Sequence, residues 1–314
     1  MSGGSLSLAV VVATRDRPAK LHDCLGALSR SRRRPERVVV VDSASTDDRT
    51  AATGREAGAE LVRCSVPGTS RARNAGLAGV DEELVAFTDD DCLVSPDWTT
   101  ALVAAFAEDA GAAFVTGQVR ADADVHRRAW LAVSLTTDAR PRRLGPGDDP
   151  STFGHGANMA WRRRELERIG GFDESMGPAT SLRAGEDVDA WWRALRAGMT
   201  GFYTPEAVVV HRQWRSRRAA LRSHYGYGVG AGALAVKRYR TAAVQGRAGA
   251  RRQLLRGLVL DEGLGPVWRS VRQGHEIGAA ANALMFLGGL EGARRAARLA
   301  VVDGRFTPDL DGQS

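Results

Sequence analysis

Three adjacent aspartates, Asp89 to Asp91, follow directly on an apolar run that ends at Phe87. Alternate side chains of an extended chain point to the same side, so Asp89 and Asp91 would converge while Asp90 points away. Converging carboxylates repel each other unless a cation lies between them. A hard divalent ion such as Mg²⁺ or Mn²⁺ suits this position, because it prefers oxygen ligands and shares its coordination sphere with phosphate oxygens. The triplet therefore indicates a divalent-metal site, and an acidic surface turn is the alternative for the triplet taken alone.

Two earlier apolar runs, at 8–13 and 38–41, also end in polar residues. The polar residues are Thr14 and Asp16 after the first run, and Asp42 and Ser43 after the second. Ligands of open α/β sheets bind outside the carboxyl ends of the strands. We therefore expect these side chains to lie beside the aspartates.

The elements that must hold these residues alternate between strand and helix. Continuous apolar runs are typical of strands buried on both faces, and Pro18 with the spacing of Leu21, Leu25 and Leu28 predicts a helix between the first two runs. This rhythm predicts an α/β fold with a parallel, doubly wound sheet. A dinucleotide-binding domain is disfavoured, because its first strand-to-helix turn needs glycines and residues 13–18 contain none.

The composition is that of a soluble globular protein, with 314 residues, 43% hydrophobic and 26% charged. The net charge of +7 is uneven: residues 212–314 hold 18 Lys and Arg against 7 Asp and Glu, which leaves −4 for residues 1–211. No apolar run approaches the roughly 20 residues needed to cross a bilayer, and no secretory signal opens the chain. The three cysteines form neither a disulfide framework nor a zinc pattern, so we expect a cytoplasmic protein.

Further motifs follow the triplet in order along the chain. They are Gly-Ala-Asn-Met-Ala-Trp-Arg-Arg at 156–163, Gly-Gly-Phe-Asp-Glu at 170–174, Gly-Glu-Asp-Val-Asp at 185–189, and His211 after an apolar run. They are preceded by Val-Ala-Thr-Arg-Asp-Arg-Pro at 12–18, Val-Val-Asp-Ser-Ala-Ser-Thr-Asp at 40–47, and Ala-Arg-Asn-Ala-Gly at 72–76. Together these motifs resemble the inverting family-2 glycosyltransferases with the GT-A fold, over about residues 6–215.

The resemblance implies roles for residues around a nucleotide-sugar donor. Asp91, with His211 in reach, would hold a Mn²⁺ or Mg²⁺ ion that bridges the two phosphates. The donor itself would be bound by Thr14, Asp16, Asp42, Ser43, Arg71, Asp89 and Asp90. Two of these assignments have alternatives: Arg71 as a solvent-exposed helix residue, and His211 as a structural histidine.

The resemblance also implies a catalytic base. Inversion is a single displacement, which needs one base to take the acceptor's proton, and Asp187 matches the family pattern at the start of a predicted helix. Ordinary helix-start acidity is the alternative. The acceptor side would comprise His155, Asn158, Trp161, Gly171 and Glu186.

The implied activity is transfer of one sugar to a small-molecule, glycan or lipid-linked acceptor. The Gln/Arg-x-x-Arg-Trp motif of processive synthases does not follow His211. UDP is the family's commonest nucleotide, and dTDP and GDP stay open. Two other classes are weighed: a nucleotidyltransferase, which would need a glycine-rich basic loop after the first strand, and a protein that binds nucleic acid through its basic C-terminal third.

We expect a catalytic domain over 1–215 and a helical C-terminal subdomain over 216–314. Helices are predicted at 219–239, 251–260 and 279–302, and Gly288, Gly289 and Gly292 are expected to interrupt the last of them. This subdomain would either fold over the acceptor cleft or place basic helices peripherally on the inner face of the membrane.

Overall fold

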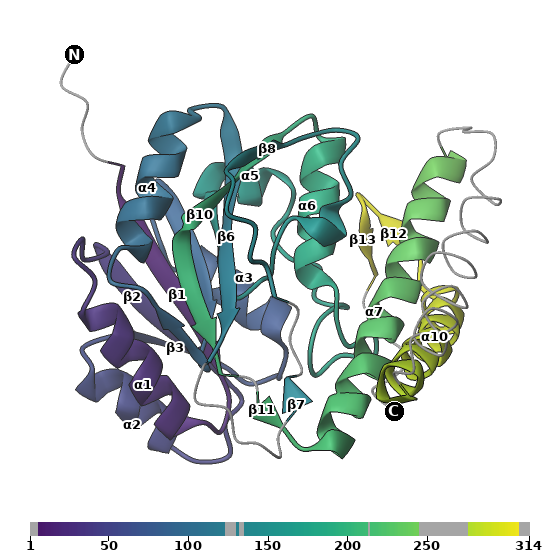
Figure 1. The fold of residues 1–314 in the computed structure, drawn as a ribbon, viewed down its shortest axis with the longest axis horizontal. Helices are drawn as coiled ribbons and strands as arrows, with labels where there is room; N and C mark the ends of the chain where they lie inside the picture. Colours follow the sequence, from purple (N-terminus) through teal and green to yellow (C-terminus); the bar gives the residue numbers. More distant parts are fainter. Residues whose placement is uncertain (1–5, 123–129, 132–134, 213, 245–275, 308–314) are drawn as a thin grey trace. The chain divides into compact units, whose positions relative to one another are not determined.

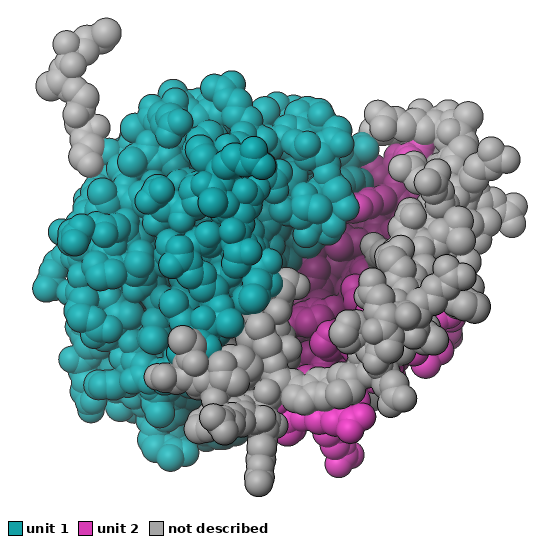
Figure 2. Space-filling view, viewed as in Figure 1, with its two compact units in different colours: residues 1–125, 133–172, 187–213 teal, residues 126–132, 173–186, 214–314 magenta. Residues whose placement is uncertain are grey.

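The computed structural model describes residues 6–122, 130–131, 135–212, 214–244 and 276–307. The chain forms two compact units, which Figure 2 shows in separate colours. The first unit comprises residues 1–125, 133–172 and 187–213, and the second comprises residues 126–132, 173–186 and 214–314.

The first unit is built around a mixed sheet of nine strands among the described residues (Figure 1). Its strands are β1 (Leu8–Thr14), β2 (Arg37–Ser43), β3 (Glu60–Cys64), β4 (Leu84–Asp89), β5 (Cys92–Val94), β6 (Ala112–Ala121), β8 (Arg142–Leu144), β9 (Met159–Arg162) and β10 (Thr200–His211). Its helices are α1 (Pro18–Ser29), α2 (Arg49–Glu56), α3 (Thr69–Ala78), α4 (Trp98–Glu108), α5 (Arg163–Arg168) and α6 (Glu186–Arg196), with a 3₁₀ turn at Pro150–Thr152.

The strand order β3-β2-β1-β4-β9-β6-β10-β5 places the predicted strand ends together. β1 pairs in parallel with β2 and β4, so Thr14 lies opposite Asp42 and Ala13 opposite Asp89. β9 runs antiparallel between β4 and β6, and β5 and β8 pair antiparallel with β10. The α/β fold with helices on a partly parallel sheet is confirmed, and the antiparallel strands make the sheet mixed.

Two apolar layers cover the sheet. α1 and α4 bury Leu21 and Trp98 against one face, and α3 and α6 bury Leu77 and Trp191 against the other. The strands β1 and β4 are buried along almost their whole length, which explains their uninterrupted apolar sequences. A strand end that projects from such a layer is held rigidly, so the polar residues after β1, β2 and β4 have fixed positions.

The second unit contains two long helices, α7 (Arg217–Val244) and α10 (Glu276–Ala296). It also contains two small antiparallel pairs: β7 (Trp130–Leu131) with β11 (Trp214–Arg215), and β12 (Val301–Val302) with β13 (Arg305–Phe306). The helices predicted at 219–239 and 279–302 correspond to α7 and α10, and the one predicted at 251–260 lies outside the described residues. No helix in the described ranges combines the length and apolarity that crossing a membrane requires.

The glycines of α10 correct one expectation, because they lie within a continuous helix instead of interrupting it. A Cβ at Gly292 would lie 1.9 Å from the Val229 carbonyl oxygen, and one at Gly288 would lie 2.2 Å from the Tyr225 carbonyl oxygen. The partner helix contributes Gly228, whose Cβ would lie 1.9 Å from the Met285 carbonyl oxygen. Close backbone approach therefore accounts for these glycines, and packing outweighs their low helix propensity.

A buried ion pair joins distant segments of the second unit. Lys237 Nζ lies 2.5 Å from Asp173 Oδ2, and both side chains are almost completely buried. Asp173 also accepts hydrogen bonds from the backbone N–H groups of Ser175 (2.9 Å) and Phe306 (2.7 Å). The Gly-Gly-Phe-Asp-Glu motif thus anchors α7 and β13 through its aspartate.

Candidate active site

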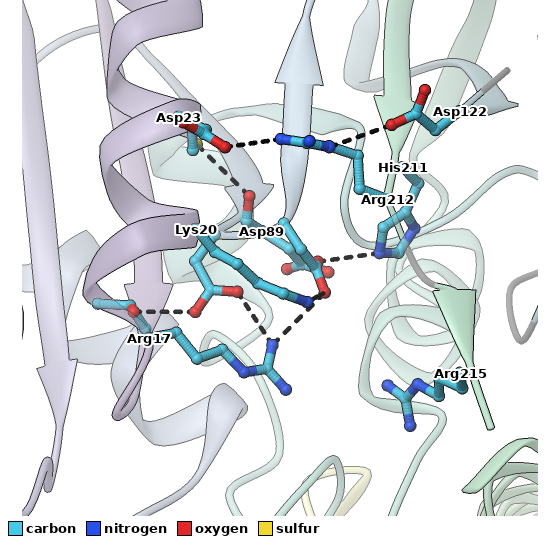
Figure 3. A network of polar contacts seen from close by, with 12 residues as sticks. Arg17, Lys20, Asp23, Asp89, Asp122, His211, Arg212 and Arg215 are labelled. Carbon is cyan, nitrogen blue, oxygen red and sulfur yellow. Dashed lines mark hydrogen bonds and ion pairs between the residues drawn. The ribbon is translucent and has the colours of Figure 1, made fainter. Parts of the chain in front are cut away.

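Each carboxylate of the Asp89–Asp91 triplet is paired with a cation. Arg73 Nη2 donates to Asp89 Oδ1 at 3.1 Å, from helix α3. Arg17 Nη1 donates to Asp90 Oδ1 at 3.0 Å, and Lys20 Nζ donates to Asp91 Oδ2 at 3.1 Å. Figure 3 shows Arg17 and Lys20 reaching from the start of α1 toward the aspartates. The triplet is therefore charge-neutralised within the protein.

The pKa values of the buried carboxylates Asp90 and Asp91 shift in opposite directions. Burial raises the pKa of Asp90 to about 6, although the charge of Arg17 acts against the increase. Burial also acts to raise the pKa of Asp91, but the hydrogen bond from His211 and the ammonium of Lys20 outweigh it and hold this pKa well below its usual value. Asp91 is thus a permanent anion of the site at neutral pH.

Asp91 and His211 form the centre of a set of groups suited to a divalent cation. His211 Nε2 lies 3.1 Å from Asp91 Oδ1, and both side chains are buried. The ligand atoms of Asp89, Asp91, Cys92 and His211 all lie within 4.8 Å of one another. His211 Nδ1 has no hydrogen-bond partner among the described residues. Two carboxylates and an imidazole fit Mn²⁺ or Mg²⁺, whereas burial raises the pKa of the Cys92 thiol well above its usual value and disfavours the thiolate.

The loops after β1 and β2 are tied together beside this centre. Asp16 has a positive φ of 53° and accepts hydrogen bonds at Oδ1 from the backbone N–H (2.7 Å) and hydroxyl (2.9 Å) of Thr46. These hydrogen bonds hold the pKa of Asp16 below its usual value. Its own N–H donates to Ser45 Oγ at 2.9 Å. The Asp16 carboxylate therefore fixes the shape of the two loops.

Asp42 offers an oxygen atom toward these loops. Its Oδ1 accepts a hydrogen bond from the Ser45 N–H at 2.9 Å. Its Oδ2 has no hydrogen-bond partner in the described ranges, and the nearest cation, Arg63 Nε, is 3.9 Å away. A buried carboxylate oxygen without a hydrogen bond is costly and indicates a missing donor, such as an N–H of a ligand.

Thr14 and Ser43 have protein partners. Thr14 Oγ1 donates to Asp90 Oδ2 at 2.9 Å. Ser43 Oγ accepts the Gly68 N–H at 3.0 Å and so joins β2 to the start of α3. These two residues shape the predicted donor side and orient its charged groups.

Gly156 links the aspartate triplet to Asp187. The Gly156 carbonyl accepts a hydrogen bond from Arg73 Nη2 at 3.2 Å, and its N–H donates to Asp187 Oδ2 at 2.8 Å. Asp187 Oδ1 accepts the Val188 N–H at 2.8 Å, so both oxygens of this half-buried carboxylate are oriented. A Cβ on Gly156 would lie 3.0 Å from Asp187 Oδ2 and 3.1 Å from the Arg73 guanidinium. Asp89, Arg73 and Asp187 therefore belong to one connected site.

His155 completes this side of the site. Its ring lies 5.3 Å from the His211 ring, between centroids, and its Nδ1 accepts the Ala157 N–H at 3.1 Å. Desolvation, together with the neighbouring His211, lowers the pKa of His155. A neutral ring that accepts at Nδ1 carries its proton on Nε2.

Other predicted acceptor residues are occupied within the protein. Asn158 is fully buried and bonds Trp98 Nε1 (2.8 Å) and the carbonyl oxygens of Gln118 (2.9 Å) and Ala207 (2.8 Å). Trp161 is fully buried beside Phe114 in the apolar core. Both side chains are therefore held in the interior of the protein.

The last three predicted residues are Gly171, Glu186 and Arg71. Gly171 has a φ of 70°, its carbonyl accepts Arg193 Nη2 at 2.8 Å, and a Cβ there would lie 2.6 Å from Asn74 Oδ1. Glu186 is buried at the start of α6. Arg71 Nη1 donates to the Pro67 carbonyl at 3.2 Å. On the same helix, Arg73 is the arginine that pairs with Asp89.

The sequence interpretation missed four basic residues of the site. Arg17 and Arg73 stand inside the motifs at 12–18 and 72–76, and Lys20 is one of only two lysines in the chain. The fourth is Arg212, whose guanidinium bridges Asp23 (2.7 Å) and Asp122 (3.1 Å) while its N–H donates to the Asp91 carbonyl at 2.9 Å (Figure 3). Arg212 thus holds the loop after β4 in place.

Comparisons with known proteins bear on the family and the fold of this chain. A family model described as "Glycosyltransferase like family 2" matches residues 6–225. The pre-mycofactocin glycosyltransferase of Mycobacterium tuberculosis is 32% identical over 179 residues, which cover 54% of this chain and 35% of that protein. The succinoglycan biosynthesis protein ExoM of Rhizobium meliloti is 32% identical over 197 residues, which cover 59% of this chain and 54% of that protein. The chain therefore spans about a third to a half of the length of these curated relatives.

A solved structure supports the fold over nearly the whole chain. The mannosyltransferase PcManGT from Pyrobaculum calidifontis, in complex with GDP-Man and Mn²⁺, superimposes with a TM-score of 0.62 at 20% sequence identity. The match covers 94% of this chain and 88% of that one, and it identifies the fold as GT-A. Because the family model covers most of the chain, the protein belongs to the glycosyltransferase family 2-like proteins.

Proposed function

We propose that this glycosyltransferase transfers one sugar, with inversion, from a nucleoside-diphosphate sugar to an acceptor hydroxyl and depends on a divalent metal ion. One observation carries the proposal: Asp89, Arg73, Gly156 and Asp187 form a continuous chain of hydrogen bonds of 2.8–3.2 Å. This chain links a candidate metal centre to a single carboxylate. The nucleotidyltransferase and nucleic-acid-binding alternatives are set aside, because the chain belongs to a glycosyltransferase family.

The donor side of the proposal uses the carboxyl ends of β1, β2 and β4. Asp91 and His211, with Asp89, would hold Mn²⁺ or Mg²⁺, and the ion when bound would stabilise the negative charge of the departing diphosphate. Asp42 Oδ2 would accept a hydrogen bond from an N–H of the nucleobase. The support is that this buried oxygen has no hydrogen-bond partner among the described residues. Thr14, Asp16, Ser43, Arg71, Asp89 and Asp90 would shape and bind the rest of the nucleotide.

The acceptor side uses Asp187 as the general base. Its two backbone hydrogen bonds fix both oxygens and leave each a further lone pair for the acceptor's proton. His155, Gly171 and Glu186 would border the acceptor. The single carboxylate agrees with inversion, which proceeds by one displacement and needs one base.

The nucleotide is proposed from the family and the neighbour. UDP is the commonest nucleotide of the family, and the solved mannosyltransferase was in complex with GDP-Man, so both belong in the first tests. We further propose that residues 1–215 form the catalytic domain and residues 216–314 a helical subdomain. Peripheral membrane binding through this basic subdomain stays a proposal for lipid-linked acceptors.

A panel of UDP-, GDP- and dTDP-sugars tests the proposal. Release of nucleoside diphosphate is measured with Mn²⁺, with Mg²⁺ and with EDTA. NMR of the product then reports whether the anomeric configuration has changed. We expect release from one donor class only with metal, and an inverted product. A retained configuration would contradict the role of Asp187 as the base of a single displacement.

A further inference from the structure

The aspartate triplet is already neutral without a metal ion. Its three carboxylates pair one-to-one with Arg73, Arg17 and Lys20 at 3.1, 3.0 and 3.1 Å. Arg17 Nη1 also lies 3.5 Å from Asp91 Oδ2. A divalent ion added here would therefore give the cluster a net charge of +2.

Lys20 is the cation in most direct competition with a metal ion. Its ammonium contacts Asp91 Oδ2, while Asp91 Oδ1 contacts His211. An ion that takes Asp91 as a ligand would share this one carboxylate group with the ammonium. Lys20 has four flexible methylenes and a side chain 46% exposed, so it can move away without unfolding α1.

The choice of lysine at this position supports a mobile cation. Of the 44 basic residues only Lys20 and Lys237 are lysines, and Lys237 occupies a completely buried ion pair. Lysine is a compact, rotatable point charge, whereas arginine forms fixed two-pronged contacts with carboxylates. A lysine is therefore suited to leave Asp91 and then contact phosphate oxygens.

We infer that Lys20 is a placeholder cation that makes metal binding depend on the donor's diphosphate. Without nucleotide, Lys20 occupies Asp91 and disfavours Mn²⁺. The diphosphate brings two negative charges, so the metal ion can take Asp91 while the displaced ammonium pairs with phosphate. This inference rests on the proposed metal site at Asp91, and it makes metal and nucleotide bind together rather than independently.

The test measures Mn²⁺ binding directly, by electron paramagnetic resonance of the free ion, and not turnover. Wild-type protein without nucleotide is compared with Lys20→Met, which keeps the apolar stem, and with Lys20→Arg, which keeps the charge. Lys20→Met should bind Mn²⁺ at least about tenfold more tightly, because a unit charge about 4 Å from a doubly charged ion opposes it by that factor even in bulk water. Lys20→Arg should stay within about threefold of wild type.

A matched control removes the same charge elsewhere. Arg30→Met alters an exposed residue at the C-terminal end of the same helix and should leave Mn²⁺ affinity unchanged. Calorimetric titration with UDP and with GDP, each with and without Mn²⁺, then gives the coupling factor. We expect Mn²⁺ to raise nucleotide affinity by a large factor in the wild type and by a clearly smaller one in Lys20→Met.

The outcomes separate this inference from the proposed function. If Asp91→Asn removes Mn²⁺ binding but Lys20→Met binds the ion as weakly as wild type does, the placeholder role is overturned and the metal site stands. If Asp91→Asn binds Mn²⁺ like the wild type, or no variant binds it even with UDP or GDP, the metal site itself is wrong and the inference fails with it. Tighter nucleotide-free binding in Lys20→Met alone supports it.

Discussion

At the scale of single residues, the site depends on side chains that already have protein partners. Asp187 is oriented by two backbone N–H groups, and Asp89 is held by Arg73. Such partners hold a carboxylate in one rotamer. Proton transfer and metal binding both require a carboxylate in a fixed orientation. In the proposed function, binding and chemistry use different carboxylates, so substitutions can test the two roles separately.

Asp187→Asn should lower kcat by about 10²–10⁴-fold, because the amide keeps the shape of the side chain but cannot accept the acceptor's proton. Affinity for the nucleotide should change little. Steady-state kinetics with a saturating donor, together with nucleotide calorimetry, measures both. Glu167→Gln removes an exposed carboxylate on α5 and serves as the control. A wild-type kcat in Asp187→Asn would remove this residue from the chemistry.

Arg73→Met should reduce both stability and activity. The guanidinium is buried and bonds Asp89 and the Gly156 carbonyl, so its loss leaves two acceptors without a donor at a cost of about 1–3 kcal/mol each. Urea unfolding and kcat/KM report the two effects. Arg164→Met, on the exposed face of α5, is the matched control and should change neither. Unchanged unfolding in Arg73→Met would show that the hydrogen bonds contribute nothing.

At the scale of helices and strands, local sequence signals predict some elements and fail for others. β1, β2 and β4 are continuous apolar runs, so their ends and the polar residues after them could be predicted. β9 is only Met159–Arg162 and lies within a motif interpreted for acceptor binding, so its strand character was not recognised. The Lys20–Asp91 contact joins residues 71 positions apart, which no local pattern reveals.

Glycines in the second unit also show that local sequence signals can fail. Their low helix propensity predicts an interrupted helix, whereas the structure has a continuous helix in close contact with its partner. Gly228→Ala should destabilise the α7–α10 pair by about 1–3 kcal/mol, because its Cβ would lie 1.9 Å from the Met285 carbonyl oxygen. Gly289→Ala is the matched control on α10: its Cβ would meet nothing closer than 3.8 Å, so it should be neutral or stabilising. The measurement is the thermal unfolding temperature of both variants. Equal changes in this temperature would contradict close packing at Gly228.

At the scale of the whole molecule, the candidate site and the two long helices belong to different compact units. The first unit holds Asp91, His211 and Asp187, and the second holds the long helices α7 and α10. Motifs in family order predicted the GT-A fold, because each motif is a short run of neighbouring residues that the sequence shows directly. The pairing of basic side chains with the aspartates depends on tertiary structure and had to be observed.

Lys237→Met should be the most destabilising of these substitutions, at about 3–5 kcal/mol, because it leaves the buried Asp173 carboxylate without its cation. The double variant Lys237→Met with Asp173→Asn should regain part of this loss. Urea unfolding of both variants measures the difference. A single variant as stable as wild type would show that the Asp173 hydrogen bonds from Ser175 and Phe306 alone suffice.

The most direct test of the central claim is nucleoside-diphosphate release from the best donor before and after removal of metal, in the wild type and in Asp91→Asn. We predict that EDTA abolishes release by the wild type, that Mn²⁺ restores it, and that Asp91→Asn stays inactive in both conditions while still folded. Wild-type turnover that continues undiminished in excess EDTA would contradict a metal-dependent transferase centred on Asp91.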